Sequence, residues 1–185
     1  MAVLEIVTTE HPVLRQVAAP VTDWTPELQA LIDDMIETMR VAPGVGLAAP
    51  QVACPLRLAV VETPPEHDDD DQPVPESRRL YVIINPEIVW ESRKLVDGIE
   101  GCLSIPGYLG EVNRHYAIRV QALDRFGRKQ RLALSGWTAR IFQHEIDHLN
   151  GVLYTDLLTA PENFWTEEEY AALYGASDEE EAPRG

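Results

Sequence analysis

Between residues 25 and 41, apolar residues recur with the spacing of one face of an α-helix, and acidic residues fall on the opposite face. Thr25 is a suitable N-cap residue, and Pro26 after it is favoured at the first helical position. The pattern therefore predicts an amphipathic N-terminal helix over about 25–41. Its apolar face consists of Leu28, Leu31, Ile32, Met35 and Met39.

Shorter apolar or alternating runs predict β-strands through the middle of the chain. These runs cover residues 56–62, 80–84, 87–91, 116–123 and 129–134. Asn85 and Pro86 separate the runs 80–84 and 87–91. A turn at 124–128 joins the last two runs as a predicted hairpin. Residues 63–77 contain four prolines and four consecutive aspartates, so we expect a solvated surface loop there.

Helical periodicity returns between residues 135 and 149, where Ser135 can cap the first turn and Gly151 follows the last. We expect a further helix over 161–174 and a disordered tail over 175–185. A helix, several strands and then helices are typical of an α+β domain with mostly antiparallel sheet. We expect one domain over 1–160, followed by an acidic helix and tail over 161–185.

Composition narrows the class of protein. The chain has 185 residues, of which 45% are hydrophobic, enough for one domain with its own core. We see no apolar run of the roughly 18 residues that a membrane span needs and no secretory signal, so we expect no membrane association. A net charge of -16 argues against nucleic-acid binding through a broad basic surface. The two cysteines, Cys54 and Cys102, fit a reducing compartment such as the cytoplasm.

The segment QHEIDHLNG, residues 143–151, carries the clearest chemical signal. His144 and His148 are four residues apart, so on a helix they share one face and can bind one metal ion. Glu145 follows the first histidine and is placed to act as a general base. This spacing predicts a catalytic divalent-metal site on the helix of about 136–149.

A catalytic site of this kind needs a third protein ligand and one open position. Metzincin peptidases would have a histidine at position 154, but this residue is Tyr154. Thermolysin-like peptidases take a glutamate from a later helix, which Glu167–Glu169 could supply, although such a run is more typical of a solvated face. Cys102, in EGCLS, offers a thiolate suited to zinc or ferrous iron. Spacing alone leaves these candidates open.

A third unusual segment, GVGLAAPQV at 44–52, is rich in small residues and lacks the Lys-Ser/Thr of a phosphate-binding loop. Its Gln51 could donate to a developing oxyanion. Together, GVGLAAPQ, EGCLS and QHEIDHLNG resemble the three motifs of the peptide deformylases, GxGxAAxQ, EGCxS and QHExDHxxG, in the same order. The resemblance covers most of residues 5–155.

The resemblance implies a metal-dependent hydrolase that removes the formyl group from N-formylmethionine on newly made polypeptides and releases formate. It implies antiparallel sheets packed around the central metal-binding helix. Cys102, His144 and His148 would bind the ion, Glu145 would transfer the proton, and Gln51 with the backbone N–H of Leu103 would stabilise the oxyanion.

The resemblance also implies the surroundings of the reaction centre. The peptide backbone would pair with Val45, Gly46 and Gly101. Val45, Ile141 and the aliphatic part of Arg140 would line the pocket for the methionine side chain. Three further charged residues would orient the metal ligands, and these are Glu100, Arg114 and Asp147.

The resemblance further implies Fe²⁺ as the physiological ion, with Zn²⁺ or Ni²⁺ as alternatives in a purified sample. The location would be the cytoplasm of a bacterium, or an organelle after removal of a transit peptide. Residues 162–185 contain eight acidic residues and one arginine, so we do not expect ribosome association through a basic tail. The alternative functions are an HExxH metallopeptidase with a late glutamate ligand and a non-catalytic, peptide-binding relative of the deformylases.

Overall fold

A computed structural model describes residues 2–63, 66–67, 73–74 and 77–174. Three α-helices, α1 (Pro26–Val41), α2 (Gly136–Leu149) and α3 (Glu167–Tyr174), are joined by strands and by short 3-10 turns, η1 (Pro12–Arg15), η2 (Ala49–Val52) and η4 (Tyr154–Asp156). The strands are β1 (Gly46–Ala48), β2 (Leu58–Glu62), β3 (Glu66–His67), β4 (Pro73–Val74), β5 (Leu80–Glu91), β6 (Leu95–Cys102), β7 (Ile105–His115), β8 (Ala117–Leu123), β9 (Lys129–Ser135) and β10 (Phe164–Thr166).

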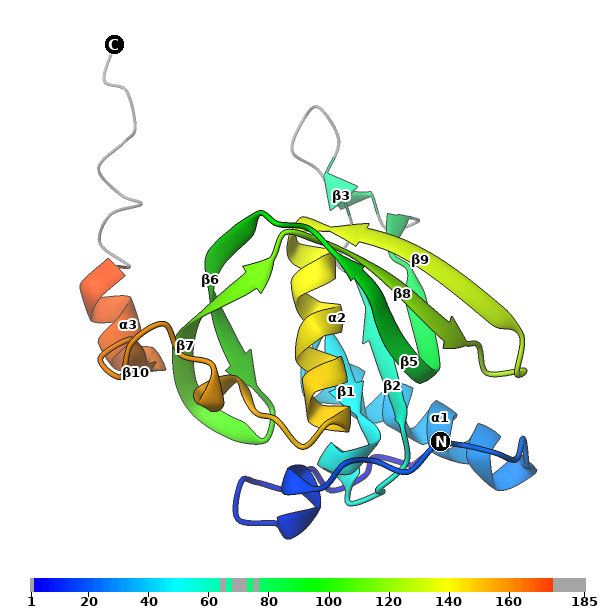
Figure 1. The fold of residues 1–185 in the computed structure, drawn as a ribbon. Helices are drawn as coiled ribbons and strands as arrows, with labels where there is room; N and C mark the ends of the chain where they lie inside the picture. Colours follow the sequence, from blue (N-terminus) through cyan, green and yellow to red (C-terminus); the bar gives the residue numbers. More distant parts are fainter. Residues whose placement is uncertain (1, 64–65, 68–72, 75–76, 175–185) are drawn as a thin grey trace.

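Helix α2 lies between two antiparallel sheets (Figure 1). The larger sheet has the strand order β1-β2-β5-β8-β9, and the smaller has the order β10-β7-β6. Helix α2 contacts β1, β2, β8 and β9 of the larger sheet and β7 of the smaller one. The expected α+β class, with antiparallel sheets around a central helix, is therefore confirmed.

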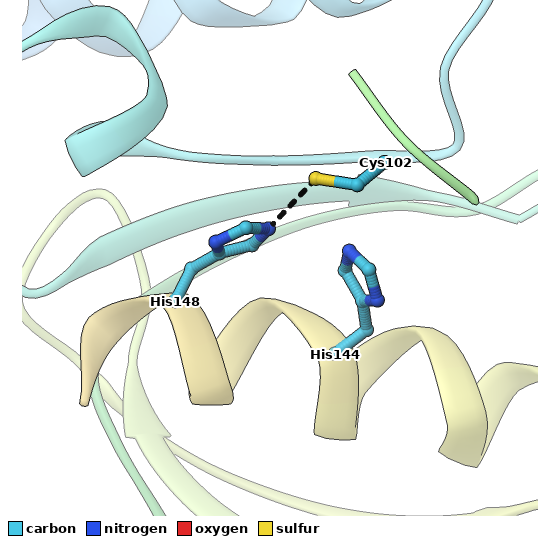
Figure 2. Close-up of side chains that lie close together, drawn as sticks. All are labelled: Cys102, His144 and His148. Atoms are coloured by element: carbon cyan, nitrogen blue, oxygen red, sulfur yellow. Dashed lines mark hydrogen bonds between the residues drawn. The ribbon is translucent and has the colours of Figure 1, made fainter. Parts of the chain in front are cut away.

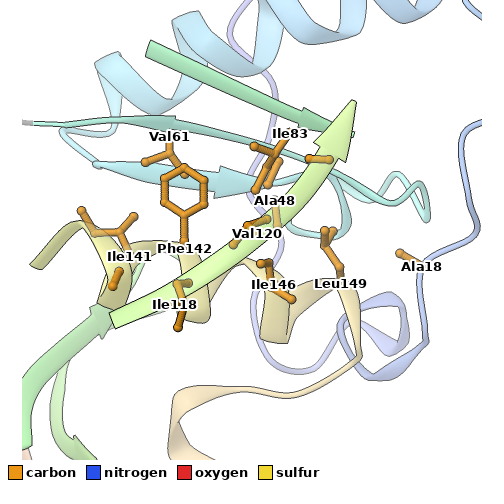
Figure 3. Packing of buried hydrophobic residues seen from close by; sticks show 13 residues of the cluster. Ala18, Ala48, Val61, Ile83, Ile118, Val120, Ile141, Phe142, Ile146 and Leu149 are labelled. Carbon is orange, nitrogen blue, oxygen red and sulfur yellow. The ribbon is translucent and has the colours of Figure 1, made fainter. Parts of the chain in front are cut away.

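Strand β2 of the larger sheet is buried on both faces, which explains why its first four residues, 58–61, are all apolar. Ala59 and Val61 belong to the cluster around α2, which also contains Phe142 (Figure 3). The ring of Phe142 packs edge-on to Tyr81. Leu58 and Val60 alternate with them and face the cluster around α1. Since successive strand residues point to opposite faces, one short apolar segment serves both cores.

Several predicted elements are present with nearly the expected bounds. Helix α1 begins after Thr25, whose side-chain oxygen accepts a hydrogen bond from the backbone N–H of Leu28. The hairpin of β8 and β9 pairs in regular antiparallel register. Helix α2 ends before Gly151, which has a φ of 74°. No helix in the described part of the chain is long and apolar enough to cross a membrane.

Other sequence expectations were wrong in detail. Residues 80–91 form one strand, in which Asn85 takes a left-handed φ of 50° at an irregularity, so the strand continues past Pro86. Ser135 makes no side-chain capping hydrogen bond. The C-terminal helix begins at Glu167 and not at residue 161, because Phe164–Thr166 pair with β7 as β10.

The acidic segment 63–77 includes two short strands that the sequence did not predict. Glu66–His67 and Pro73–Val74 pair as an antiparallel ladder. The rest of the expected loop lies almost entirely outside the described residues, as does the expected disordered tail 175–185.

Candidate active site

Helix α2 presents His144 and His148 on one face, one turn apart. Their rings lie edge to face with centroids 4.9 Å apart. The opposite, apolar face of the helix is fixed against the larger sheet by residues such as Phe142 and Ile146 (Figure 3). Packing of the helix therefore sets the position and direction of both imidazole rings.

Cys102 reaches the same place from the smaller sheet. It ends β6, directly after a shift of register between Gly101 and Cys102 in the β6–β7 ladder. Its Sγ lies 3.2 Å from Nε2 of His148, and the side chain points toward both histidines (Figure 2). One possible ligand atom from each of Cys102, His144 and His148 lies within 4.8 Å of the others.

These three residues fit a divalent metal ion. A thiolate with two imidazole groups is a donor set that zinc and ferrous iron accept. Nδ1 of His144 donates to Glu100 at 2.9 Å, which leaves Nε2 of the ring available to an ion. Among the described residues, the late glutamates Glu167–Glu169 are not part of a metal-binding group, whereas Cys102 is.

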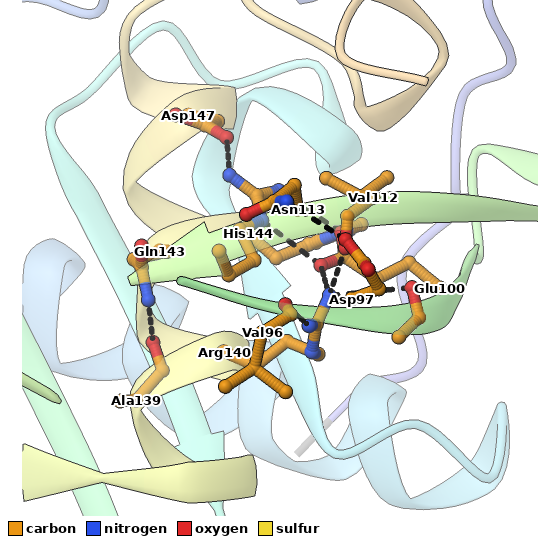
Figure 4. Close-up of polar contacts among 12 residues, drawn as sticks. Val96, Asp97, Glu100, Val112, Asn113, Ala139, Arg140, Gln143, His144 and Asp147 are labelled. Carbon is orange, nitrogen blue, oxygen red and sulfur yellow. Dashed lines mark hydrogen bonds and ion pairs between the residues drawn. The ribbon is translucent and has the colours of Figure 1, made fainter. Parts of the chain in front are cut away.

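Glu100 on β6 connects the histidine face of α2 to the smaller sheet (Figure 4). Arg114 on β7 donates to both of its carboxylate oxygens, each at 2.9 Å, and Arg140 on α2 donates to Oε1 at 2.8 Å. Burial opposes ionisation of Glu100, but hydrogen bonds from Arg114 and His144 hold the pKa of this carboxyl below its usual range. Arg114 also forms an ion pair with Asp147 on α2.

Glu145 faces the cleft from α2, close to the backbone of the small-residue segment. Its side chain is buried, and burial raises its pKa to about 7. One carboxylate oxygen, Oε2, has no hydrogen-bond partner among the described residues. A Cβ atom added to Gly46 would lie 2.3 Å from the other oxygen, so the carboxylate occupies space that only a glycine at position 46 leaves open.

Gln51, in η2, is held by hydrogen bonds at both ends of its amide. Its Oε1 accepts from the backbone N–H of Ala48 at 2.8 Å. Its Nε2 donates to Oγ of Ser104 at 3.3 Å and approaches Sγ of Cys102 at 3.5 Å. The amide nitrogen of Gln51 and the ring of His148 therefore approach the same sulfur atom, Sγ of Cys102.

A cleft of about 410 Å³ opens over these residues. All five residues expected to bind substrate line it, as do Gln51, Leu103 and Glu145. These five are Val45, Gly46, Gly101, Arg140 and Ile141. The guanidinium of Arg140 is turned away to Glu100 and to the carbonyl oxygens of Val96 and Val112. Arg140 can therefore offer the cleft only its aliphatic part.

The sequence analysis missed several residues that complete the cleft. Ser104, which orients Gln51, is a fixed position of the EGCLS motif and could have been singled out there. Tyr108 and Glu167 line the cleft itself. No motif includes Tyr108, and the sequence analysis considered Glu167 only as a candidate metal ligand, because its place at the cleft depends on the pairing of β10 with β7.

The chain as a whole is similar to known proteins. The sequence model of the polypeptide deformylase family matches residues 3–164. The peptide deformylase of Symbiobacterium thermophilum is 52% identical over 159 residues, which are 86% of this chain and 68% of that protein.

Solved structures give the same result. The crystal structure of peptide deformylase from Thermus thermophilus is 42% identical, has a TM-score of 0.76 and shares 94% of each chain. A class I type b peptide deformylase from Acinetobacter baumannii, bound to Met-Ala-Ser, is 35% identical with a TM-score of 0.76, covering 85% of this chain and 99% of that one.

Proposed function

Because the chain belongs to the peptide deformylase family, whose members remove the N-formyl group, we propose that the convergent residues described above form its catalytic centre. Cys102, His144 and His148 would hold one divalent ion, and Glu145 would be the general acid and base. The observation that carries this assignment is the meeting of the three ligand side chains, from two elements, beside a buried carboxyl.

The proposed reaction is hydrolysis of a formamide, which gives formate and a free amino terminus. When bound, the ion supplies Lewis-acid chemistry, since it lowers the pKa of water and polarises a carbonyl group. Glu145 removes a proton from the attacking water and delivers it to the departing amine nitrogen. A carboxyl with a pKa of about 7 can accept and return a proton at neutral pH.

Gln51 and Leu103 are proposed to stabilise the oxyanion of the tetrahedral intermediate. Nε2 of Gln51 approaches Sγ of the proposed metal ligand Cys102. Leu103, the next residue in the sequence, lines the cleft. Donors fixed before the reaction are effective, because no reorganisation is needed as charge develops.

The methionine side chain is proposed to enter the cleft beside Val45, Ile141 and the aliphatic part of Arg140. The peptide backbone lies along Gly46 and Gly101, in the manner of an added strand. The related Acinetobacter baumannii protein binds Met-Ala-Ser, which supports a methionyl peptide as the ligand of this family. Glu100, Arg114 and Asp147 orient the ligands through the network around His144.

We propose Fe²⁺ as the physiological ion, with Zn²⁺ or Ni²⁺ able to replace it in a purified sample. A thiolate and two imidazole groups accept each of these ions. Metal analysis after anaerobic purification tests this choice, and an anaerobic sample that holds only zinc would contradict it.

We propose that the protein acts in the cytoplasm on nascent chains and that residues 1–160 form the catalytic domain, with 161–185 as an acidic extension. With eight acidic residues and one arginine in 162–185, contact with the ribosome would use another surface.

Formate release from formyl-Met-Ala-Ser, with and without a chelator, tests the proposed function. We expect formate in stoichiometric yield with Met-Ala-Ser, loss of the reaction in chelator and recovery when Fe²⁺ or Zn²⁺ is returned. Cleavage of internal peptide bonds instead would favour a metallopeptidase. Binding without formate release would favour a non-catalytic protein.

A further inference from the structure

The rim of the cleft includes one acidic residue from the C-terminal part of the chain. Thr166 of β10 pairs with Tyr108 of β7, so Glu167, the first residue of α3, lies next to the segment that forms one wall of the cleft. Glu167 is itself a lining residue and is exposed. A carboxylate is therefore available to solvent at the edge of the substrate site.

The other charged side chains that line the cleft, among the described residues, are not available in this way. Glu100 and Arg140 are buried and form an ion pair. Glu145 is buried, and His144 is bonded to Glu100. Glu167 is thus the charged group in the described cleft that a substrate side chain can reach without entering the reaction centre.

The two following glutamates are arranged differently. Glu169 accepts a hydrogen bond from the backbone N–H of Thr166, and the hydroxyl oxygen of Thr166 accepts one from the N–H of Glu169. This reciprocal capping fixes the start of α3 and uses the carboxylate of Glu169. Glu168 does not line the cleft. The start of α3 therefore places one of three neighbouring glutamates at the rim of the substrate site.

We propose that Glu167 is a specificity-determining residue that favours formyl peptides with lysine or arginine downstream of the methionine. This inference rests on the proposed deformylase function. Once the methionine side chain occupies the pocket, the residues after it must leave the cleft past its rim, where the carboxylate attracts a cation and repels an anion. An exposed pair of charges contributes modestly, so we expect a preference of about three- to tenfold at low salt.

The overall charge of -16 could by itself attract cationic peptides, so the control must keep the total charge change the same. E167Q and E168Q each remove one negative charge at neighbouring positions of α3. A second variant, E167K, reverses the charge at the rim.

The experiment measures kcat/KM from formate release for formyl-Met-Lys-Ala, formyl-Met-Ala-Lys and their Glu counterparts. For at least one of the two positions, the wild-type Lys-to-Glu ratio should be about three to ten at low ionic strength. E167Q should bring that ratio close to one, E167K should invert it, and E168Q should keep it. High salt should reduce the wild-type ratio.

Equal ratios in wild type and E167Q at both positions would overturn the inference. So would an equal loss in E167Q and E168Q, since the preference would then come from the overall field. In both cases formyl-Met-Ala-Ser would still be deformylated by the wild-type protein. Absence of formate from every peptide would overturn the proposed function itself, and this inference with it.

Discussion

At the scale of single residues, the position of Glu145 depends on the absence of a side chain at Gly46. The proposed base and the small-residue segment approach so closely that any β-carbon at position 46 would meet the carboxylate. The close approach of Glu145 therefore explains why the segment 44–49 has a glycine at position 46.

G46A should lower kcat for deformylation by about 100-fold, because a displacement of a catalytic group by roughly 1 Å can cost that much. The added methyl group must push Glu145 away, because the three atoms nearest to it all belong to the Glu145 side chain. Formate assays together with metal analysis should show lost activity and a retained ion.

G44A is the matched control for this change. A Cβ atom at Gly44 would meet the flexible end of the Leu103 side chain at 2.9 Å, which can move aside, so the loss should be much smaller. Equal losses in the two variants would contradict the assigned role of Gly46.

At the scale of elements, a buried ionic network joins β6, β7 and α2. Glu100 contributes the carboxylate for Arg114, Arg140 and the ring of His144, and all of these groups are buried or nearly so (Figure 4). The network aligns the Cys102 strand with the histidine helix and so brings the three ligand side chains together.

E100A should reduce the free energy of unfolding by about 3–5 kcal/mol, because two buried guanidinium groups would lose their carboxylate partner. Urea denaturation in excess chelator measures this loss without a contribution from the ion. D97A, on the same strand, removes only an exposed hydrogen bond from Asn113 and should cost about 1 kcal/mol or less. A similarly small effect of E100A would show that the network does not stabilise the fold.

The same comparison of elements shows what the sequence could and could not predict. Helix α1 and the β8–β9 hairpin follow from local periodicity and capping, and both are found. The β6–β7 hairpin was not predicted as a pair of strands, because glycine and charged residues weaken its alternation of apolar and polar residues. Strand β10 was taken for helix, since only its pairing with β7 decides its conformation.

The site shows a similar division. Spacing on one helix was enough to pair His144 with His148, but it left the third ligand open between Cys102 and the late glutamates. Resemblance to a known family selected Cys102, and the structure brings it to the histidines. The contact of Ser104 with Gln51 and the place of Glu167 at the cleft were not predicted, because both are set by tertiary contacts and not by sequence distance.

At the scale of the whole molecule, the proposed ion links the two sheets through α2. A ligand that binds the folded state and not the unfolded state raises stability by about 2.7 kcal/mol when its concentration is 100 times its Kd. Loss of the ion should therefore destabilise the entire domain and not the cleft alone.

Chelation should lower the Tm of the wild-type protein by roughly 5–10 °C under those conditions. C102A should have the lower Tm already and show little further response, while C54A, which changes the other free cysteine, should respond as the wild type does. Differential scanning calorimetry measures these shifts. A chelator response that persists in C102A would contradict the ligand set.

Bound metal and formate release, measured in the same preparations of wild type, E145Q and H148A, test the central claim most directly. E145Q should keep about one ion per chain and release formate from formyl-Met-Ala-Ser at least about 100-fold more slowly. H148A should lose both the ion and the activity. Wild-type rates in E145Q, or full metal content and activity in H148A, would contradict the account.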